Sequence, residues 1–176
     1  MKIEPYIFSI CPWEIKDASS IAEQANNIRI WNCVRDYFPC PYTLNDAEDF
    51  LKMVLSRDRL CEFAIKINGK AVGGIGFIPG TDVERISAEV GYWIGEAYWG
   101  RGIVTEALRA LVGYVFETTE ITRLFAPVFD FNAASMRVLE KAGFSKVGVL
   151  HRAAVKNGRV IDLHYYELLK DDDSEE

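Results

Sequence analysis

The chain has 176 residues, a length that fits one domain with a full hydrophobic core and is short for two. Hydrophobic residues make up 49% and charged residues 26%, a balance that excludes a disordered or fibrous chain, and a net charge of −6 argues against a nucleic-acid partner. No apolar run approaches the roughly 18 residues of a membrane helix, and the first residues lack a signal-peptide pattern. We therefore expect a single cytoplasmic domain over residues 1–170, without a membrane partner, followed by an acidic tail at 171–176.

The cysteines show no metal-binding pattern. None of the four forms a Cys-x-x-Cys pair, and only two histidines could join them as ligands: Cys11, Cys33, Cys40 and Cys61, with His151 and His164. We expect no metal site, and we interpret each cysteine as a reduced thiol that is buried like a small hydrophobic side chain.

The N-terminal third predicts one strand and two helices. Residues 6–11 read as a strand, and residues 17–26 have apolar side chains at helical spacing. Asn45 with Glu48 three residues later predicts a capping box that opens a helix with an apolar stripe, Phe50, Leu51, Val54 and Leu55. The segment between the helices, 36–43, has two prolines and three aromatic residues, which predicts an ordered surface loop.

The middle of the chain predicts three strands. Residues 62–67 and 71–78 are β-rich runs on either side of Asn68-Gly69, the dipeptide most typical of a tight hairpin. Residues 86–94 form a third run with apolar even positions, so its odd positions, Glu89 among them, face the opposite way.

The C-terminal part predicts helices, a strand and a closing hairpin. Gly143 is the expected cap of the second helix, and Asn157-Gly158 is the expected hairpin turn. The expected elements are a long helix through 104–115, a strand at 123–129, a helix at 133–142 and the hairpin strands 144–155 and 159–169. This order is typical of a mixed sheet with helices on both faces.

A glycine-containing segment at 95–102 separates the third strand from the long helix. Gly100 and Gly102 allow a sharp turn and a close approach of the backbone, the first N–H groups of the helix point outward, and Arg101 adds a cation. The segment is not a P-loop, and Thr105 stands where a dinucleotide fingerprint has its third glycine. These residues alone leave open an anion-binding turn and a plain turn with a helix cap.

Three segments in this order and spacing resemble the GNAT superfamily, in particular the branch of ribosomal-protein alanine and serine N-terminal acetyltransferases. They are 88–94 (AEVGYWI), 98–107 (YWGRGIVTEA) and 132–144 (NAASMRVLEKAGF), within a resemblance that covers about residues 6–169. It implies an α/β fold with a mixed sheet of about seven strands, mostly antiparallel, about four helices on both faces, and a splayed strand pair that forms the cofactor cleft. It also implies transfer of an acetyl group from acetyl-CoA to a primary amine by direct attack in a ternary complex.

The resemblance assigns cofactor contacts to three places. The turn would hold the pyrophosphate of acetyl-CoA through Trp99, Gly100, Arg101, Gly102, Ile103, Val104 and Thr105. The strand end at Trp93 and Ile94 would offer unpaired backbone groups to the pantetheine arm and N–H groups to the thioester carbonyl. Asn132, Ser135 and Lys141 would contact the cofactor from the later helix, although Asn132 and Ser135 also fit a helix N-cap and a first-turn serine. Two positions depart from the pattern: Trp99 replaces a polar first residue and Val104 a small last one.

Acetyl transfer needs a neutral amine, a polarised carbonyl and a thiolate that can leave. Glu89 matches a position that often holds a carboxylate acting as base through water, although a solvated or ion-paired glutamate is the alternative. Ser135 is the candidate proton donor to the sulfur, with Tyr92 or Tyr98 as substitutes unless these tyrosines are core residues. The two histidines have no matching role, and we interpret them as hairpin residues.

The acceptor and the partners are less determined. The family layout places the acceptor over the N-terminal helices, where Tyr37, Phe38 and Tyr42 could line a slot or pack the loop. The same aromatic residues could serve a homodimer. A coenzyme-A-binding module without catalysis is the alternative function, and a plain nucleotide-phosphate binder requires the resemblance to be accidental.

Overall fold

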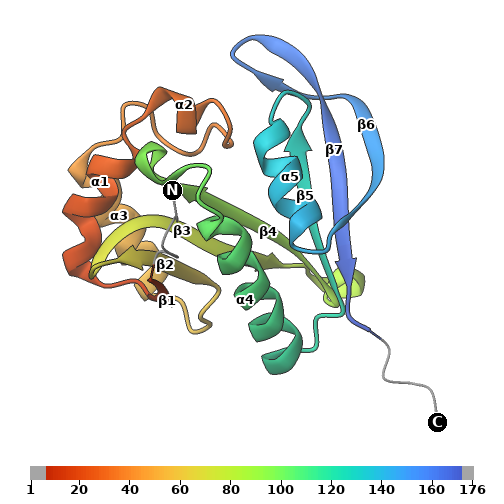
Figure 1. The fold of residues 1–176 in the computed structure, drawn as a ribbon, viewed down its shortest axis with the longest axis horizontal. Helices are drawn as coiled ribbons and strands as arrows, with labels where there is room; N and C mark the ends of the chain where they lie inside the picture. Colours follow the sequence, from red (N-terminus) through yellow and green to blue (C-terminus); the bar gives the residue numbers. More distant parts are fainter. Residues whose placement is uncertain (1–6, 172–176) are drawn as a thin grey trace, which may run out of the picture. The chain divides into compact units, whose positions relative to one another are not determined.

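A computed structural model describes residues 7–171 (Figure 1). The described chain contains seven strands and five α-helices, in the order β1 (Phe8–Pro12), α1 (Ala18–Ala25), α2 (Ile28–Trp31), α3 (Leu44–Leu55), β2 (Glu62–Ile67), β3 (Lys70–Pro79), β4 (Ser87–Ile94), α4 (Ile103–Thr118), β5 (Arg123–Phe129), α5 (Ala133–Lys141), β6 (Ser145–Lys156) and β7 (Arg159–Leu169). The strand order of the sheet is β1-β2-β3-β4-β5-β7-β6. This confirms the expected mixed, mostly antiparallel sheet.

The chain divides into two compact units. The first comprises the described parts of Met1–Gly76 and Tyr92–Ala107, and the second those of Phe77–Gly91 and Leu108–Glu176. The expectation of one domain with an acidic tail stays a prediction, and residues 172–176 of that tail lie outside the described part.

In the first unit, β2 and β3 form an antiparallel hairpin, and β1, which precedes α1 to α3 in the chain, pairs antiparallel with the other edge of β2. The helices α1 and α3 cover this part of the sheet (Figure 1). The β2–β3 turn has positive φ at Asn68 (50°) and Gly69 (77°), the signature of the expected tight hairpin. The residue after β1 and side chains from β2, β3, the two helices and the loop before α3 form one buried cluster: Trp13, Ala18, Ile21, Ala25, Tyr42, Ala47, Leu51, Val54, Ala64 and Ala71. Leu55, expected in the apolar stripe of α3, is exposed instead.

The predicted cap of α3 was wrong by two residues. Thr43 is the N-cap, and its hydroxyl accepts from the Asp46 backbone N–H at 3.2 Å while Asp46 accepts from the Thr43 N–H at 2.7 Å. The Asn45 side chain instead donates to Asp49 one turn later, at 3.1 Å. Because Thr43-x-x-Asp46 closes both hydrogen bonds, α3 starts at Leu44.

The short helix α2 was not predicted. Its four residues are too few to show a helical period, and its N-cap, Asn27, accepts a hydrogen bond from the Arg29 N–H at 2.8 Å. This helix is the fifth, where about four were expected. Elsewhere the ends of the strands and helices differ from the predicted ends by at most two residues, except that α4 extends to Thr118. Ile86 was expected to begin β4, but this strand begins one residue later and Ile86 is exposed.

In the second unit, β5 lies between β4 and β7. Its residues alternate between a buried face, with Leu124, Ala126 and Val128, and a half-exposed face. The parallel ladder with β4 covers three residue pairs, from Ser87–Arg123 to Glu89–Phe125, whereas β5 stays paired with β7 as far as its last residue.

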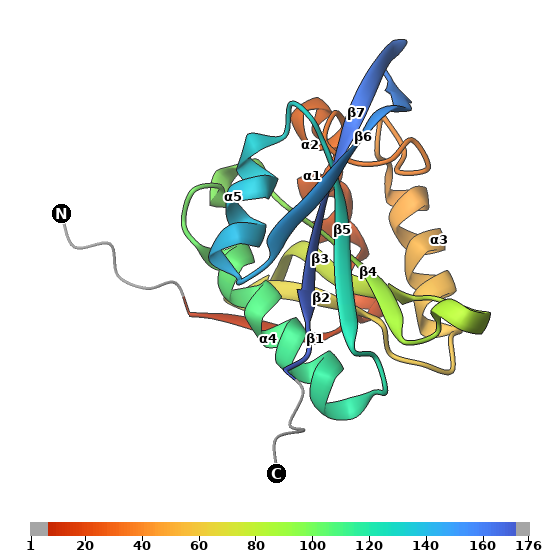
Figure 2. The same cartoon turned by 90° about the vertical axis from the view of Figure 1, so that its right-hand side faces the viewer.

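The β6–β7 hairpin is long, and its tip extends beyond the end of β5 (Figures 1 and 2). Its turn has positive φ at Asn157 (52°) and Gly158 (72°), and Gly143 (98°) ends α5, as predicted. Most of β6 is exposed along its length.

The expectation that each cysteine is buried holds only for Cys61. Cys11 is half-buried, and Cys33 and Cys40 are exposed because they lie in turns between α2 and α3. Among residues 7–171, no group of three or more histidine, cysteine or acidic side chains could hold a metal ion. The same part of the chain contains no helix long and apolar enough to cross a membrane.

Candidate functional site

The glycine turn joins β4 to α4 in the first unit. Gly100 and Gly102 have φ of 72° and 77°, a left-handed conformation that side chains with a Cβ rarely adopt. The Gly102 carbonyl accepts from the Glu106 N–H at 3.1 Å, so this glycine immediately precedes the first turn of α4. The N–H groups of that first turn have no partner within the helix, and they carry the positive end of its dipole. The exposed Arg101 side chain extends from this turn.

Polar contacts fix the conformation of this turn. Glu96 accepts a hydrogen bond from Asn27 at 2.8 Å and forms an ion pair with Arg29, so it ties the turn to the start of α2. The Arg29 guanidinium also lies over the Trp99 ring, 4.9 Å from its centroid. The Trp99 indole Nε1 donates to the Ile94 carbonyl at 2.9 Å. These contacts were not predicted, because nothing in the local sequence pairs residues almost 70 positions apart.

The end of β4 differs from the expectation in one respect. The Gly95 N–H donates to the Val72 carbonyl at 2.8 Å, which directs it toward β3. Since N–H groups alternate sides along a strand, the Ile94 N–H points away from β3. The Ile94 carbonyl was expected to be unpaired, but it already accepts the Trp99 indole hydrogen.

Trp93 is held in the first unit by close aromatic packing. A Cβ at Gly74 would lie 2.9 Å from both the Trp13 ring and the Trp93 indole nitrogen, so only glycine fits between them. The Phe38 ring packs edge-on against Trp93, with centroids 5.8 Å apart, and against Tyr42, at 4.9 Å. Phe38 and Tyr42 are thus brought together by the packing of the loop.

The three aromatic residues predicted for the acceptor slot have different surroundings. Tyr42 is 7% exposed, and burial together with Asp46 raises its pKa to about 12. Tyr37, by contrast, is 79% exposed. This favours the packed-loop interpretation for Phe38 and Tyr42 and leaves Tyr37 on the surface.

The remaining predicted residues for cofactor and catalysis belong mainly to the second unit. Asn132 caps α5, accepting from the Ser135 N–H at 3.2 Å, so the expected N-cap is present. Lys141 is exposed at the end of α5, and its carbonyl accepts from Arg109 at 2.5 Å. Glu89 is half-buried on β4.

The tyrosine and histidine candidates are divided between the units. In the first, Tyr92 and Tyr98 are half-buried, and the Arg101 guanidinium lies 5.7 Å from the Tyr98 ring centroid. In the second, the His151 Nδ1 lies 2.8 Å from Asp162. Two hydrogen bonds lower the pKa of Asp162: the larger effect comes from the backbone N–H of Arg152 and the smaller one from the side chain of His151. Asp162 thereby holds the irregular part of β6, which fits the hairpin interpretation of His151.

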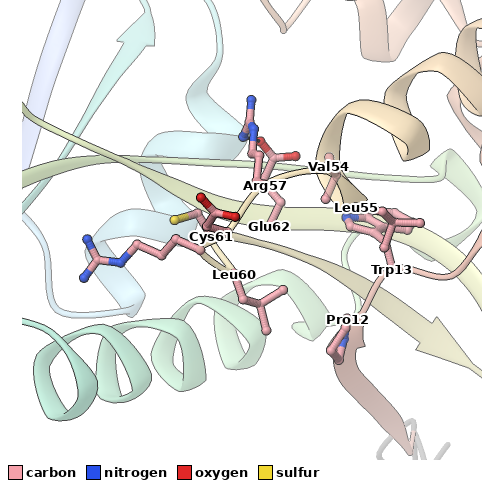
Figure 3. Close-up of a pocket in the computed structure, with 10 residues that line it drawn as sticks. Pro12, Trp13, Val54, Leu55, Arg57, Leu60, Cys61 and Glu62 are labelled. Carbon is pink, nitrogen blue, oxygen red and sulfur yellow. Dashed lines mark hydrogen bonds and ion pairs between the residues drawn. The ribbon is translucent and has the colours of Figure 1, made fainter.

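A surface cavity of about 170 Å³ lies elsewhere in the first unit, at the end of β1 and the loop between α3 and β2 (Figure 3). Trp13, Val54 and Leu60 contribute its apolar side, and the Arg57–Glu62 ion pair lies at its edge. It contains none of the predicted site residues.

The geometry of the turn is suited to an anionic group. A Cβ at Gly100 or Gly102 would meet no protein atom within 4 Å, so the space beside both glycines is open to a ligand. The exposed Arg101 and the dipole of α4 favour an anion at this place. Ile103 and Thr105 are buried beneath the turn, and Val104 is half-buried.

Comparison with known proteins identifies the family. Residues 9–145 match the acetyltransferase (GNAT) domain. A probable N-acetyltransferase of Bacillus subtilis, YjcK, is 29% identical over 93% of this chain and 94% of its own, and the putative ribosomal N-acetyltransferase YdaF of the same organism is 37% identical over 62% and 59%. The ribosomal-protein-S5-alanine acetyltransferase of Vibrio fischeri has the same fold, with a TM-score of 0.81 at 21% identity over 98% and 97% of the two chains. The chain therefore belongs to the GNAT family of acetyl-CoA-dependent N-acetyltransferases.

Proposed function

We propose that this acetyltransferase acts on a primary amine, either the α-amine of a protein N-terminus or the amine of a small molecule, by direct attack in a ternary complex. The observation that carries the proposal is the braced turn at the start of α4, with left-handed Gly100 and Gly102 beside open space. A protein N-terminus is the first choice, because the similar proteins YdaF and the Vibrio enzyme bear names of ribosomal-protein acetyltransferases.

Acetyl-CoA supplies the acetyl group as a thioester, from which the thiolate of coenzyme A departs as a good leaving group when the C–S bond breaks. The turn 99–105 holds the pyrophosphate, with Asn132, Ser135 and Lys141 as further contacts that rest on the family resemblance. The Ile94 N–H, which is directed away from β3, is our candidate donor to the thioester oxygen. A fixed donor of this kind contributes about 3–4 kcal/mol to the stability of an oxyanionic transition state.

Glu89 is the proposed base. An α-amine has a pKa of roughly 7.7–8.0 and a lysine-like amine one near 10.4, so proton removal matters more for the second. Glu89 would receive the proton through a water molecule, and Ser135, or else Tyr92 or Tyr98, would return one to the sulfur. The homodimer and the slot at Tyr37 remain predictions.

The test is thiol release from acetyl-CoA with peptides beginning in serine, alanine or methionine, polyamines, aminoglycosides and free amino acids. We expect release above the hydrolysis background with one acceptor class. Glu89→Gln should lower kcat/KM by about 100-fold for an amine of high pKa, with partial recovery as the pH rises, because general bases contribute about 10² or more.

Glu84→Gln, an exposed glutamate outside the site, is the matched control and should behave as wild type. Binding of acetyl-CoA without transfer to any acceptor would favour the alternative, a coenzyme-A-binding module. Equal pH profiles for wild type and Glu89→Gln would remove Glu89 from the role of base.

A further inference from the structure

A row of aromatic and acidic side chains lies on the half-exposed face of β5 in the second unit. Phe125 and Tyr165 have nearly parallel rings, with centroids 6.3 Å apart and planes 8° apart. Both residues are half-buried, whereas the opposite face of β5 is fully buried. Part of the surface of both residues is therefore accessible to solvent.

The sheet register places carboxylates on both sides of Phe125. Glu89 of β4 is its partner in the parallel ladder, and Glu167 of β7 is its partner in the antiparallel one. Residues paired in a ladder project from the same face of a sheet, so all three side chains lie on one face. The half-buried state of each agrees with this placement.

This face already binds a cation from the chain itself. The Arg123 guanidinium lies 4.9 Å from the Phe125 ring centroid, and its Nε donates to Glu167 at 2.7 Å. Because Arg123 compensates the charge of Glu167, that carboxylate is already engaged. Tyr165 extends the aromatic surface beyond the ring that Arg123 covers.

We propose that Phe125 and Tyr165 form the acceptor platform of the enzyme: they hold a positively charged group of the acceptor, so that the neighbouring primary amine that reacts lies beside Glu89. This inference rests on the proposed function and deepens it, because it selects acceptors that carry positive charge near the reacting amine. The ammonium form of the reacting amine transfers one proton through water to the Glu89 carboxylate, which becomes a carboxylic acid, and the neutral amine keeps the electron pair that attacks. Phe125 and Tyr165 act as specificity-determining residues, since they take no part in the proton transfer.

The platform predicts which acceptors bind well. An aromatic face and a carboxylate attract a second positive charge and repel an acidic group next to the reacting amine. Peptides that begin with serine and differ only in Lys or Glu at the second position should therefore differ in KM, with the lysine peptide lower.

Steady-state kinetics of Phe125→Leu and Tyr165→Leu test the platform. Tyr165→Leu should raise the KM for the lysine peptide by roughly 3- to 30-fold, which corresponds to one cation–π contact, while kcat and the KM for acetyl-CoA change less. Phe125→Leu should raise the same KM by a smaller factor, because the Phe125 ring is already covered by Arg123 and stacks against Tyr165. Phe125→Tyr, which keeps the ring, should restore the KM. The control is Phe129→Leu, which removes another half-buried ring from the same face of β5 and should leave the KM unchanged.

A binding measurement separates the two proposals. Titration of wild type with the lysine peptide, followed by NMR at the Tyr165 ring, reports on the platform without turnover. Peptide binding that is lost in Tyr165→Leu, but with no acetyl transfer in wild type, would support the platform and overturn the proposed function. Transfer in wild type with an unchanged KM in both leucine variants, or an equal rise of KM in Phe129→Leu, would overturn the platform alone.

Discussion

The indole of Trp99 donates a hydrogen bond to the carbonyl of Ile94, so the side chain that departs from the family pattern fastens the glycine turn to the end of β4. The Arg29 guanidinium covers the same ring and pairs with Glu96. Trp99 thus braces the turn through two contacts, although its ring is partly exposed at the surface.

Replacement of Trp99 by Phe should weaken coenzyme A binding without unfolding the protein. The variant keeps an aromatic ring but loses one hydrogen bond, whose net contribution is about 0.5–1.5 kcal/mol, so we expect Kd to rise by up to about 10-fold. Isothermal titration with coenzyme A measures the change. Arg29→Met should give a similar loss, and the double variant should lose less than the sum because both act on one brace. Fully additive losses would show that the two contacts act independently.

Gly102→Ala should weaken cofactor binding more than it weakens folding. The new methyl group meets no protein atom, so the folding cost comes from its φ of 77° and amounts to about 1–2 kcal/mol. The methyl group would project into the open space where we place the pyrophosphate, so Kd should rise by more than 10-fold. Gly113→Ala, in the interior of α4, is the control and should stabilise the helix by up to about 1 kcal/mol. An unchanged Kd in Gly102→Ala would place the pyrophosphate elsewhere.

The fold was predictable because its turns and alternation are local. Asn68-Gly69 and Asn157-Gly158 both have the positive φ that their sequence requires, and β4 buries Ala88, Val90 and Ile94, three of the even positions read as apolar in residues 86–94. The cap of α3 was missed because two overlapping four-residue patterns compete there, and the structure uses Thr43 with Asp46. Only the hydrogen-bond geometry distinguishes them.

The site was predictable only in part. The glycine turn follows from its spacing, but the brace of Glu96 by Asn27 and Arg29 depends on chain folding over almost 70 residues. The Glu89–Phe125–Glu167 row depends on strand register, which periodicity does not fix between strands distant in sequence.

Lys66→Met should destabilise the first unit strongly. Lys66 is 5% exposed on β2, and its Nζ lies 2.8 Å from the buried Asp17 and 2.5 Å from Glu14. Burial alone would lower the pKa of Lys66, but these two carboxylates outweigh it and raise the pKa. Removal of the lysine leaves Asp17 buried without its cation, which costs about 3–5 kcal/mol.

Chemical denaturation at pH 7 measures this loss of folding free energy. The control is Lys16→Met, which removes an exposed partner of Glu14 and should cost less than about 1 kcal/mol. Equal losses in the two variants would contradict a special role for the buried pair.

Tyr42→Phe should make the protein more resistant to alkali. Burial first, and the charge of Asp46 second, raise the pKa of Tyr42 to about 12 in the folded protein, against an ordinary value near 10. The neutral phenol is therefore favoured by folding: its stabilisation is complete below pH 10 and declines as the pH rises through 10 to 12. This decline amounts to at most about 2–3 kcal/mol for two pH units.

Urea denaturation of wild type and Tyr42→Phe at pH 7.5 and pH 11 should show similar stability at the lower pH and a higher stability of the phenylalanine variant at the higher pH. Tyr37→Phe, at an exposed position, is the control and should follow wild type at both pH values. If Tyr42→Phe loses stability in parallel with wild type between the two pH values, ionisation of this buried phenol is not what weakens the fold in alkali.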